Sequence, residues 1–182
     1  DGVGGDCHIL GDITRIEDEL DLPLAPELHC ATVGTDVGLI AELDPEEVKQ
    51  AILTSCYGGF LVGRSAAAAM LGAGRGTIMF TGASAGVKGF PQSAPFAMGK
   101  FGLRGLAQSM ARELHPKNIH VVHVVVDGGI RSERRGRDGR DERGPDAWLD
   151  PDAIADTYYH LHGQHRSSWS WEIEVRPWVE SF

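Results

Sequence analysis

Four short runs of apolar residues predict the β-strands of this chain. The third run contains VVHVVV and is nearly continuous, as a strand buried on both faces of a sheet requires. The fourth run alternates apolar and polar residues, so one of its faces is expected to meet solvent at a sheet edge. The predicted strands are Leu24–Ala31, Thr77–Phe80, His120–Val126 and Trp169–Val175.

Helical patterns lie between these runs. The sequence DPEE at residues 44–47 combines an acidic N-cap, a proline at the first helical position and a capping glutamate, and it starts a helix that runs to about Leu71. Phe96–Leu114 carries apolar residues at helical spacing before a His-Pro pair. The remaining predicted helices are Asp12–Leu20, which is short and acidic, and Asp150 to about His162.

The order of these elements predicts an α/β fold. Strands that alternate with helices imply right-handed crossovers and a mainly parallel, doubly wound sheet with helices on both faces, which is a three-layer sandwich. The length of 182 residues favours one domain. We expect residues 1–23 to be irregular or a short helix and residues 24–182 to form the core, with four parallel strands.

The segment TIMFTGASAGVKGFPQSAPFAMGK, residues 77–100, allows two interpretations. As a first strand, its TGASAG turn would hold a pyrophosphate, and an acidic residue would follow about 20 residues later at the end of a second strand. A long helix starts near Phe96 instead, with no strand before it. This context favours a middle strand that carries a catalytic serine.

From Leu24 onward the chain resembles the later two-thirds of the short-chain dehydrogenase/reductase family. The resemblance is carried by GTIMFTGASAG as the strand with the catalytic serine, by FAMGKFGLRGLAQSMAREL as the helix of the Tyr-x-x-x-Lys motif, and by NIHVVHVVVDGGI as the next strand and its turn. It is closest to atypical members with Phe at the Tyr position. The resemblance implies a truncated, Rossmann-like fold, since the family's first three strands and their glycine-rich turn have no counterpart here.

The resemblance also assigns roles to four residues. Ser84 would hold a substrate carbonyl or alcohol, and Lys100 would hold the nicotinamide ribose and lower the pKa of the family tyrosine. Phe96 stands where that tyrosine should be, and a phenyl ring has no proton to exchange. Ser55 aligns with the asparagine that the family uses in a proton relay.

The cofactor implied by the resemblance is NAD or NADP. The Asn-Ala-Gly turn of the family appears here as CAT at residues 30–32, and its Pro-Gly turn appears as Asp127-Gly128. Because the glycine-rich turn has no counterpart, cofactor binding is expected to be weak or absent. The residues expected to contact the cofactor are Ala31, Thr32, Lys100, Asp127, Gly128 and Ile130.

Two functions follow from these observations. The first is NAD(P)-linked oxidoreduction of a small carbonyl or alcohol substrate, which is expected to be slow because general acid–base help is worth about 10²–10⁴ in rate. The alternative is a non-catalytic remnant that acts as an oligomerisation or interaction module. A homo-oligomer is expected through the helices at 45–71 and 96–114. The edge strand Leu24–Ala31 is expected to be covered by another chain or by the N-terminal residues.

Composition and charge argue against several other functions. The net charge of −9 speaks against a nucleic-acid partner, and the arginines of Arg131–Arg143 are interleaved with acids and glycines, which is typical of a surface loop. Three widely spaced cysteines form no disulfide or zinc pattern and suit a reducing cytoplasm. The sequence contains no run of about 18 apolar residues, so no membrane span is predicted.

The histidines are candidate metal ligands by residue type. His160 and His162 are two apart and do not share a helical face, and His165 adds no carboxylate or cysteine to the set. His120 and His123 are three apart on a strand and point to opposite faces. No metal site is expected.

Overall fold

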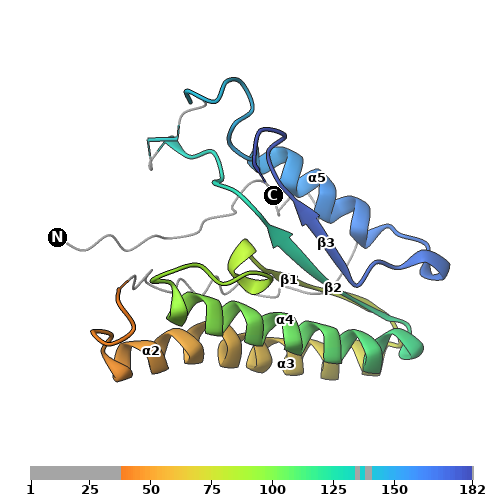
Figure 1. Cartoon of the computed structure of the whole chain (residues 1–182). Coiled ribbons are helices and arrows are strands. Elements are labelled where there is room, and N and C mark those ends of the chain that lie inside the picture. The colour runs from red at the N-terminus through yellow and green to blue at the C-terminus, as the bar shows by residue number, and fades with distance from the viewer. Residues whose placement is uncertain (1–37, 134–135, 138–140, 182) are drawn as a thin grey trace.

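The computed structural model describes residues 38–133, 136–137 and 141–181 (Figure 1). Within these residues the strands form one parallel sheet in the order β1-β2-β3. The predicted strand Leu24–Ala31 lies outside the described residues, and so does the expectation that its edge is covered. The strands are β1 (Gly76–Thr81), β2 (Ile119–Val126) and β3 (Glu172–Val175).

β2 is the central strand, and all eight of its residues are buried. It pairs with β1 from Gly76↔Ile119 onward and with β3 from His123↔Glu172 onward. The apolar run of β2 therefore has a sheet neighbour on each edge and a helix layer on each face. The strand predicted from VVHVVV is confirmed.

The helix predicted from residue 44 to about Leu71 forms as three joined segments, α2 (Pro45–Ile52), the π-helix η1 (Leu53–Tyr57) and α3 (Gly58–Ala73). The Asp44 carboxylate accepts a hydrogen bond of 2.8 Å from the backbone N–H of Glu46, as the capping pattern predicted. The π segment was not predicted. It inserts a wider turn where these helices cross α4.

The helix α4 (Ala94–Leu114) begins two residues before the predicted start and is followed by the 3₁₀ turn η3 (His115–Lys117). Two glycines of α4 let the π segment approach closely. A Cβ atom on Gly99 would lie 2.8 Å from Cβ of Ser55, and one on Gly102 would lie 2.7 Å from Sγ of Cys56. The small residues of α4 therefore set how deeply the two helices pack.

Helices cover both faces of the sheet, as Figure 1 shows with α3 and α4 on one side and α5 (Pro151–His162) on the other. On the α4 side the core is built from Ile78, Phe80, Leu103, Ala107, Ala111, Leu114, Ile119 and Val121. On the α5 side it is built from Val122, Val124, Val126, Leu149, Ile154 and Leu161. This is a three-layer, Rossmann-like α/β arrangement, and the predicted fold class is confirmed.

The last strand is shorter than predicted. Only Glu172–Val175 pairs with β2, whereas Trp169 follows the 3₁₀ turn η5 (Arg166–Ser168) and stacks on His120, with 4.7 Å between ring centroids. Trp169 therefore packs on a buried histidine and does not pair with β2. One face of this strand was expected to meet solvent. On its polar side Glu174 is exposed, but Glu172 is only 18% exposed and is bonded to residues of α4 and β2.

Candidate active site

The carboxyl ends of the parallel strands meet at one edge of the sheet, where ligands bind in open α/β folds. β1 ends at Thr81 and continues into the turn that contains Ser84. β2 ends at Val126 and is followed by Asp127, while β3 is followed by Arg176. The candidate site is built at this carboxyl edge.

Ser84 opens the 3₁₀ turn η2 (Ser84–Gly86) directly after β1. Its backbone carbonyl accepts hydrogen bonds from the N–H groups of Val87 at 3.0 Å and Lys88 at 2.9 Å. Ser84 is half-buried at the carboxyl end of β1.

Lys100 lies on the second turn of α4 and reaches the end of β1. Its Nζ donates a hydrogen bond of 3.1 Å to the carbonyl oxygen of Thr81. The turn Ser84–Gly86 also packs against Lys100, since a Cβ atom on Gly86 would lie 3.2 Å from the carbonyl oxygen of Lys100. The fold thus brings the Ser84 turn and Lys100 together.

Phe96 lies one helical turn before Lys100, and its ring is half-buried. The Lys100 Nζ is 5.8 Å from the centroid of the Phe96 ring, which is within the range of a cation–π contact. The aromatic ring therefore occupies the space beside the lysine without providing a hydroxyl.

Ser55 lies on the π segment and is 8% exposed. It contacts α4 at Gly99, one residue before Lys100. Its Oγ makes no hydrogen bond to the described residues. The structure thus places Ser55 behind the start of α4, with a buried hydroxyl that faces the same helix as Lys100.

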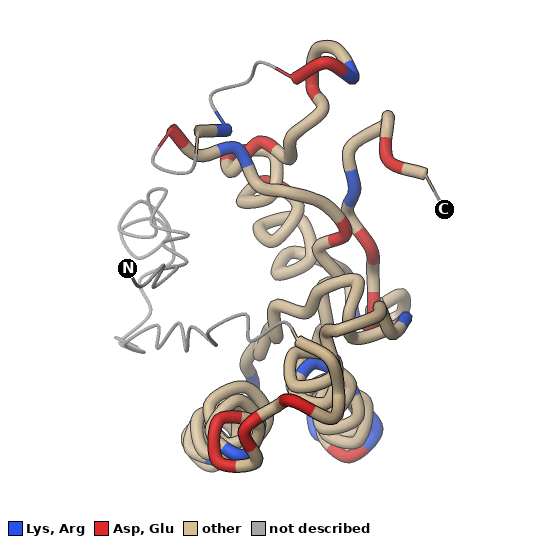
Figure 2. Tube along the Cα trace, turned by 60° about the vertical axis from the view of Figure 1, so that its left-hand side comes forward, with Lys and Arg blue, Asp and Glu red and all other residues tan. Residues whose placement is uncertain are grey.

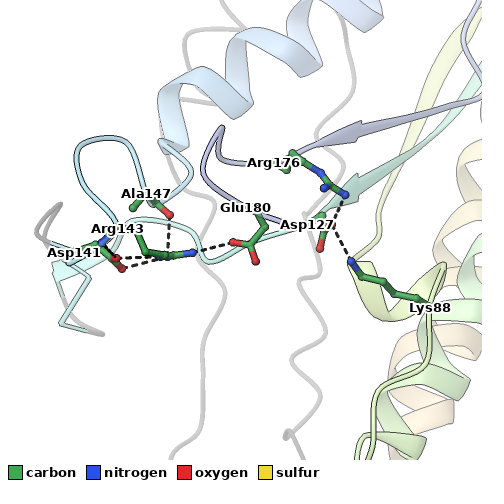
Figure 3. Close-up of polar contacts among 7 residues, drawn as sticks. All are labelled: Lys88, Asp127, Asp141, Arg143, Ala147, Arg176 and Glu180. Atoms are coloured by element: carbon green, nitrogen blue, oxygen red, sulfur yellow. Dashed lines mark hydrogen bonds and ion pairs between the residues drawn. The ribbon is translucent and has the colours of Figure 1, made fainter. Parts of the chain in front are cut away.

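Asp127 is buried at the end of β2, and two cations converge on one of its oxygens (Figure 3). Its Oδ2 accepts hydrogen bonds from Arg176 at 2.7 Å and from Lys88 at 3.3 Å, and its backbone N–H donates to the carbonyl of Val175 at 2.9 Å. The aspartate ties the ends of β2 and β3 to the serine turn.

The next residues of this turn are Gly128 and Ile130. Gly128 has φ +149° and packs against Pro177, and Ile130 pairs with Leu149. They lie at the carboxyl edge beside Asp127. Ala31 and Thr32 lie outside the described residues.

A buried ionic network beside the site was not predicted. Glu172 of β3 accepts two hydrogen bonds from Arg104 of α4, at 2.6 and 2.7 Å, and lies 3.0 Å from Nδ1 of His123 on β2. The bonds from Arg104 hold the pKa of Glu172 below its usual value. Burial lowers the pKa of His123 despite the nearby carboxylate.

The same histidine touches the end of β1. A Cβ atom on Gly82 would collide with the imidazole ring of His123, and the backbone N–H of Gly82 donates to the carbonyl of Val124 at 2.7 Å. The sequence signal for this contact was a histidine inside an otherwise apolar strand. Its partners could not be read from that pattern, since they come from other elements.

The loop after β2 carries several of the arginines that were predicted to lie on the surface. Arg143 bonds to Asp141 at 2.9 Å and to Glu180 at 2.9 Å (Figure 3), and Arg131 pairs with Asp150 at 2.6 Å. Figure 2 shows Lys and Arg interspersed with Asp and Glu along the described chain. Each of these arginines therefore has an acidic partner nearby.

Among the residues that the structure describes, no three His, Cys, Asp or Glu side chains are arranged to hold a metal ion. His120 and His123 point to opposite faces, as predicted. His120 lies 2.9 Å from the carbonyl oxygen of Ser170, and burial lowers its pKa.

With this geometry in place, comparison with known proteins identifies the family. The family model described as short chain dehydrogenase matches residues 27–143, which is more than half of the chain. The chain belongs to the short-chain dehydrogenase/reductase family. The resemblance noted from the sequence is confirmed.

Particular members of the short-chain dehydrogenase/reductase family are similar over part of their length. The trans-4-hydroxycyclohexanecarboxylate dehydrogenase of Sinomonas cyclohexanicum is 36% identical over 95 residues, which are 52% of this chain and 36% of that protein. A short-chain dehydrogenase from Rhodopseudomonas palustris has a TM-score of 0.64 and 38% identity, over 78% of this chain and 57% of that one. A metagenomic short-chain oxidoreductase in complex with NADP has a TM-score of 0.64 and 30% identity, over 81% and 59%.

This chain thus spans about a third of the length of the curated relative and less than two thirds of both solved structures. One of these solved relatives, the metagenomic oxidoreductase, is in complex with NADP. Among the described residues, no helix combines the length and apolar character that crossing a membrane requires.

Proposed function

We propose that this chain supplies the substrate side of an NAD(P)-linked oxidoreductase that interconverts a small alcohol and its carbonyl compound. The observation that supports this most is the meeting of the Ser84 turn with Lys100 at the carboxyl edge, through the Gly86 contact and the 3.1 Å bond to Thr81. In this proposal the Ser84 hydroxyl donates a hydrogen bond to the reacting oxygen. Ser55 supports the start of α4 from behind.

The described residues fit the nicotinamide end of the cofactor. Lys100 holds an ammonium group at the edge where the β1 strand ends, within reach of the Thr81 carbonyl, and an ammonium suits ribose hydroxyls as hydrogen-bond acceptors. The Asp127-Gly128 turn and Ile130 lie at the same edge. When bound, the nicotinamide supplies or accepts the hydride. Among the described glycines, Gly82, Gly86 and Gly128 are close-packed against other parts of the protein, so these three do not leave room for a pyrophosphate.

In this proposal the site lacks the side chain that would exchange a proton with the substrate. Reduction of a carbonyl consumes one hydride and one proton, and oxidation of the alcohol releases both. Phe96 can neither give nor take the proton, so water or the Lys100 ammonium has to exchange it. A general acid is typically worth about 10²–10⁴ in rate, and we therefore propose slow turnover.

We further propose a homo-oligomer formed through the helices at 45–71 and 96–114. Several large apolar side chains of these helices are exposed, and four of them recur at positions 53, 57, 60 and 61, which is one stripe of a helix. An identical patch on a second copy can cover such a stripe across a two-fold axis. The exposed residues are Leu53, Tyr57, Phe60, Leu61, Val62, Leu71, Met98 and Phe101.

A second candidate function is a non-catalytic family remnant that acts as an interaction module. Phe96 favours it, because a ring without a proton fills the space beside Lys100. The same exposed helix stripe would then be the functional surface. In either case a cytoplasmic location and the absence of a nucleic-acid partner stay predictions.

Titration with NADH and with NADPH, followed by the fluorescence of the reduced nicotinamide, separates the two candidates. A micromolar dissociation constant for either cofactor is expected if the chain works as an oxidoreductase on its own. No binding at millimolar cofactor would reject independent hydride transfer and leave the interaction module.

A further inference from the structure

Lys88 stands four residues after Ser84 on the turn at the carboxyl edge. The hydrogen bond of 2.9 Å from the backbone N–H of Lys88 to the carbonyl of Ser84 holds the two residues on one turn. A lysine therefore lies on the same turn as the hydroxyl that is proposed to hold the reacting oxygen.

The cations around Asp127 are not held equally. Arg176 is 16% exposed and bonds to Asp127 at 2.7 Å and to Glu174 at 2.6 Å. Lys88 is 41% exposed, and its bond to the same Asp127 oxygen is longer, at 3.3 Å. Figure 3 shows Lys88 reaching Asp127 from the serine turn, while Arg176 reaches it from the end of β3.

Lys88 can therefore leave Asp127 at low cost. If it turns toward a ligand, the buried carboxylate keeps its short bond to Arg176 and stays compensated. The Lys88 ammonium also lies 5.6 Å from the centroid of the Phe90 ring, which is 46% exposed. A half-exposed cation beside an exposed apolar ring is suited to a small acid with an aliphatic chain.

We propose that Lys88 is a specificity-determining residue that binds the carboxylate of a hydroxy-acid or oxo-acid substrate. The assignment rests on the proposed function in one respect, since Ser84 is taken to hold the hydroxyl or carbonyl oxygen at the other end of the same molecule. The substrates are then small organic acids rather than neutral alcohols and ketones.

The test compares two probes of nearly equal size, the charged 4-oxopentanoate and the neutral 4-oxopentanamide, in binding titrations with the full chain followed by ligand-observed NMR. We expect the native chain to bind the acid about tenfold more tightly than the amide, because a hydrogen bond to a charged group is stronger than a neutral one. Lys88→Met should bring this ratio to about one, and Lys88→Arg should keep most of it.

Lys117→Met is the matched control. Lys117 is 48% exposed and pairs with Glu113 at 3.4 Å, which resembles the state of Lys88, but it lies before β2 at the opposite end of the sheet. This variant should keep the native ratio. The proposal is overturned if the native chain binds both probes equally or binds neither, or if Lys88→Met keeps the preference.

Two further measurements remove ambiguity. If Lys88→Met is unfolded by circular dichroism, a salt series on the native chain decides, because a preference that comes from a half-exposed cation must shrink as ionic strength rises. An unchanged preference would overturn the proposal. NADPH binding on the same samples reports on the proposed function separately, since the acid-to-amide ratio is measured without cofactor.

Discussion

His123 and Glu172 lie opposite each other in the β2–β3 pairing, and Nδ1 of the histidine is 3.0 Å from Oε2 of the glutamate. The histidine ring is fully buried, and the glutamate is also held by two bonds from Arg104. One carboxylate thus joins the central strand, the last strand and the long helix α4. Because Gly82 packs on the same histidine, the network reaches the end of β1 beside the candidate site.

Glu172→Gln should destabilise the chain by about 1–2 kcal/mol, because Arg104 and His123 lose a charged acceptor, and the partial exposure of Arg104 limits the cost. The free energy of unfolding in urea measures this loss. Glu113→Gln is the control, since Glu113 forms an exposed pair with Lys117 and should change stability by less than about 0.5 kcal/mol. Equal effects of both substitutions would contradict the stabilising role of the network.

The stability of the chain should fall as the pH drops from about 7 to about 5. His120 and His123 are buried, and burial lowers the pKa of each, so below about pH 6.5 the unfolded chain binds protons that the folded chain excludes. Each histidine contributes at most about 1.4 kcal/mol per pH unit in this range. The pKa of Glu172 is lowered instead, so its contribution is present above the unfolded value and is lost only at more acidic pH.

Urea titrations across this pH range provide the test. The groups that face His123 are Glu172 from β3 and Arg104 and Lys100 from α4, and those that face His120 are His115 and His162. His160→Gln changes an exposed histidine and should leave the pH dependence as it is. A flat stability profile between about pH 7 and pH 5 would show that the two buried histidines do not control it.

Two glycine substitutions should change the stability of the chain in opposite directions. Gly82→Ala places a methyl group into the buried His123 ring and should cost about 2 kcal/mol or more. Gly105 lies on exposed α4 surface with open space around it, and Gly105→Ala should stabilise the chain by about 0.5–1 kcal/mol through helix propensity. Thermal unfolding of the two variants side by side measures the difference. A Gly82→Ala variant as stable as the native chain would refute the close contact.

Phe96→Tyr should raise turnover by about 10²–10⁴ with a panel of small carbonyl compounds, because it places a phenol one helical turn from Lys100. The ratio kcat/KM for the native chain and the variant measures the gain. Phe101→Tyr makes the same chemical change at a residue of α4 that is 43% exposed and should gain nothing. A variant that binds NADPH but stays inactive would show that the missing hydroxyl is not what limits the site.

Phe60→Glu should weaken the proposed homo-oligomer, because it puts a charge in the exposed stripe of α3, where Phe60 is 42% exposed and stacks near Tyr57. Light scattering after size exclusion should show the mass falling toward that of one chain. Phe90→Glu changes a ring that is 46% exposed outside these helices and should leave the mass unchanged. A native chain that already runs as a monomer would reject the oligomer.

Local patterns predicted much of the fold. The apolar run of β2 and the Asp150 cap of α5 appear where expected, because burial of a continuous strand and capping of a helix depend on neighbouring residues. The π segment Leu53–Tyr57 was missed, because its residues would suit an ordinary helix equally well. The late start of β3 was missed because Trp169 stacks on His120, a residue far away in the sequence.

Some features of the candidate site could likewise be predicted from the sequence, whereas others depend on contacts between distant residues. The residue types alone establish which chemical groups are available, including the phenylalanine at position 96 in place of a tyrosine, because residue type decides whether a side chain can exchange a proton. The contacts of Glu172 with His123 and Arg104, and the pairing of Asp127 with both Lys88 and Arg176, come from the folded arrangement of the chain. These partners are 39 to 68 residues apart, and the register of the parallel strands and the crossing of α4 bring them together.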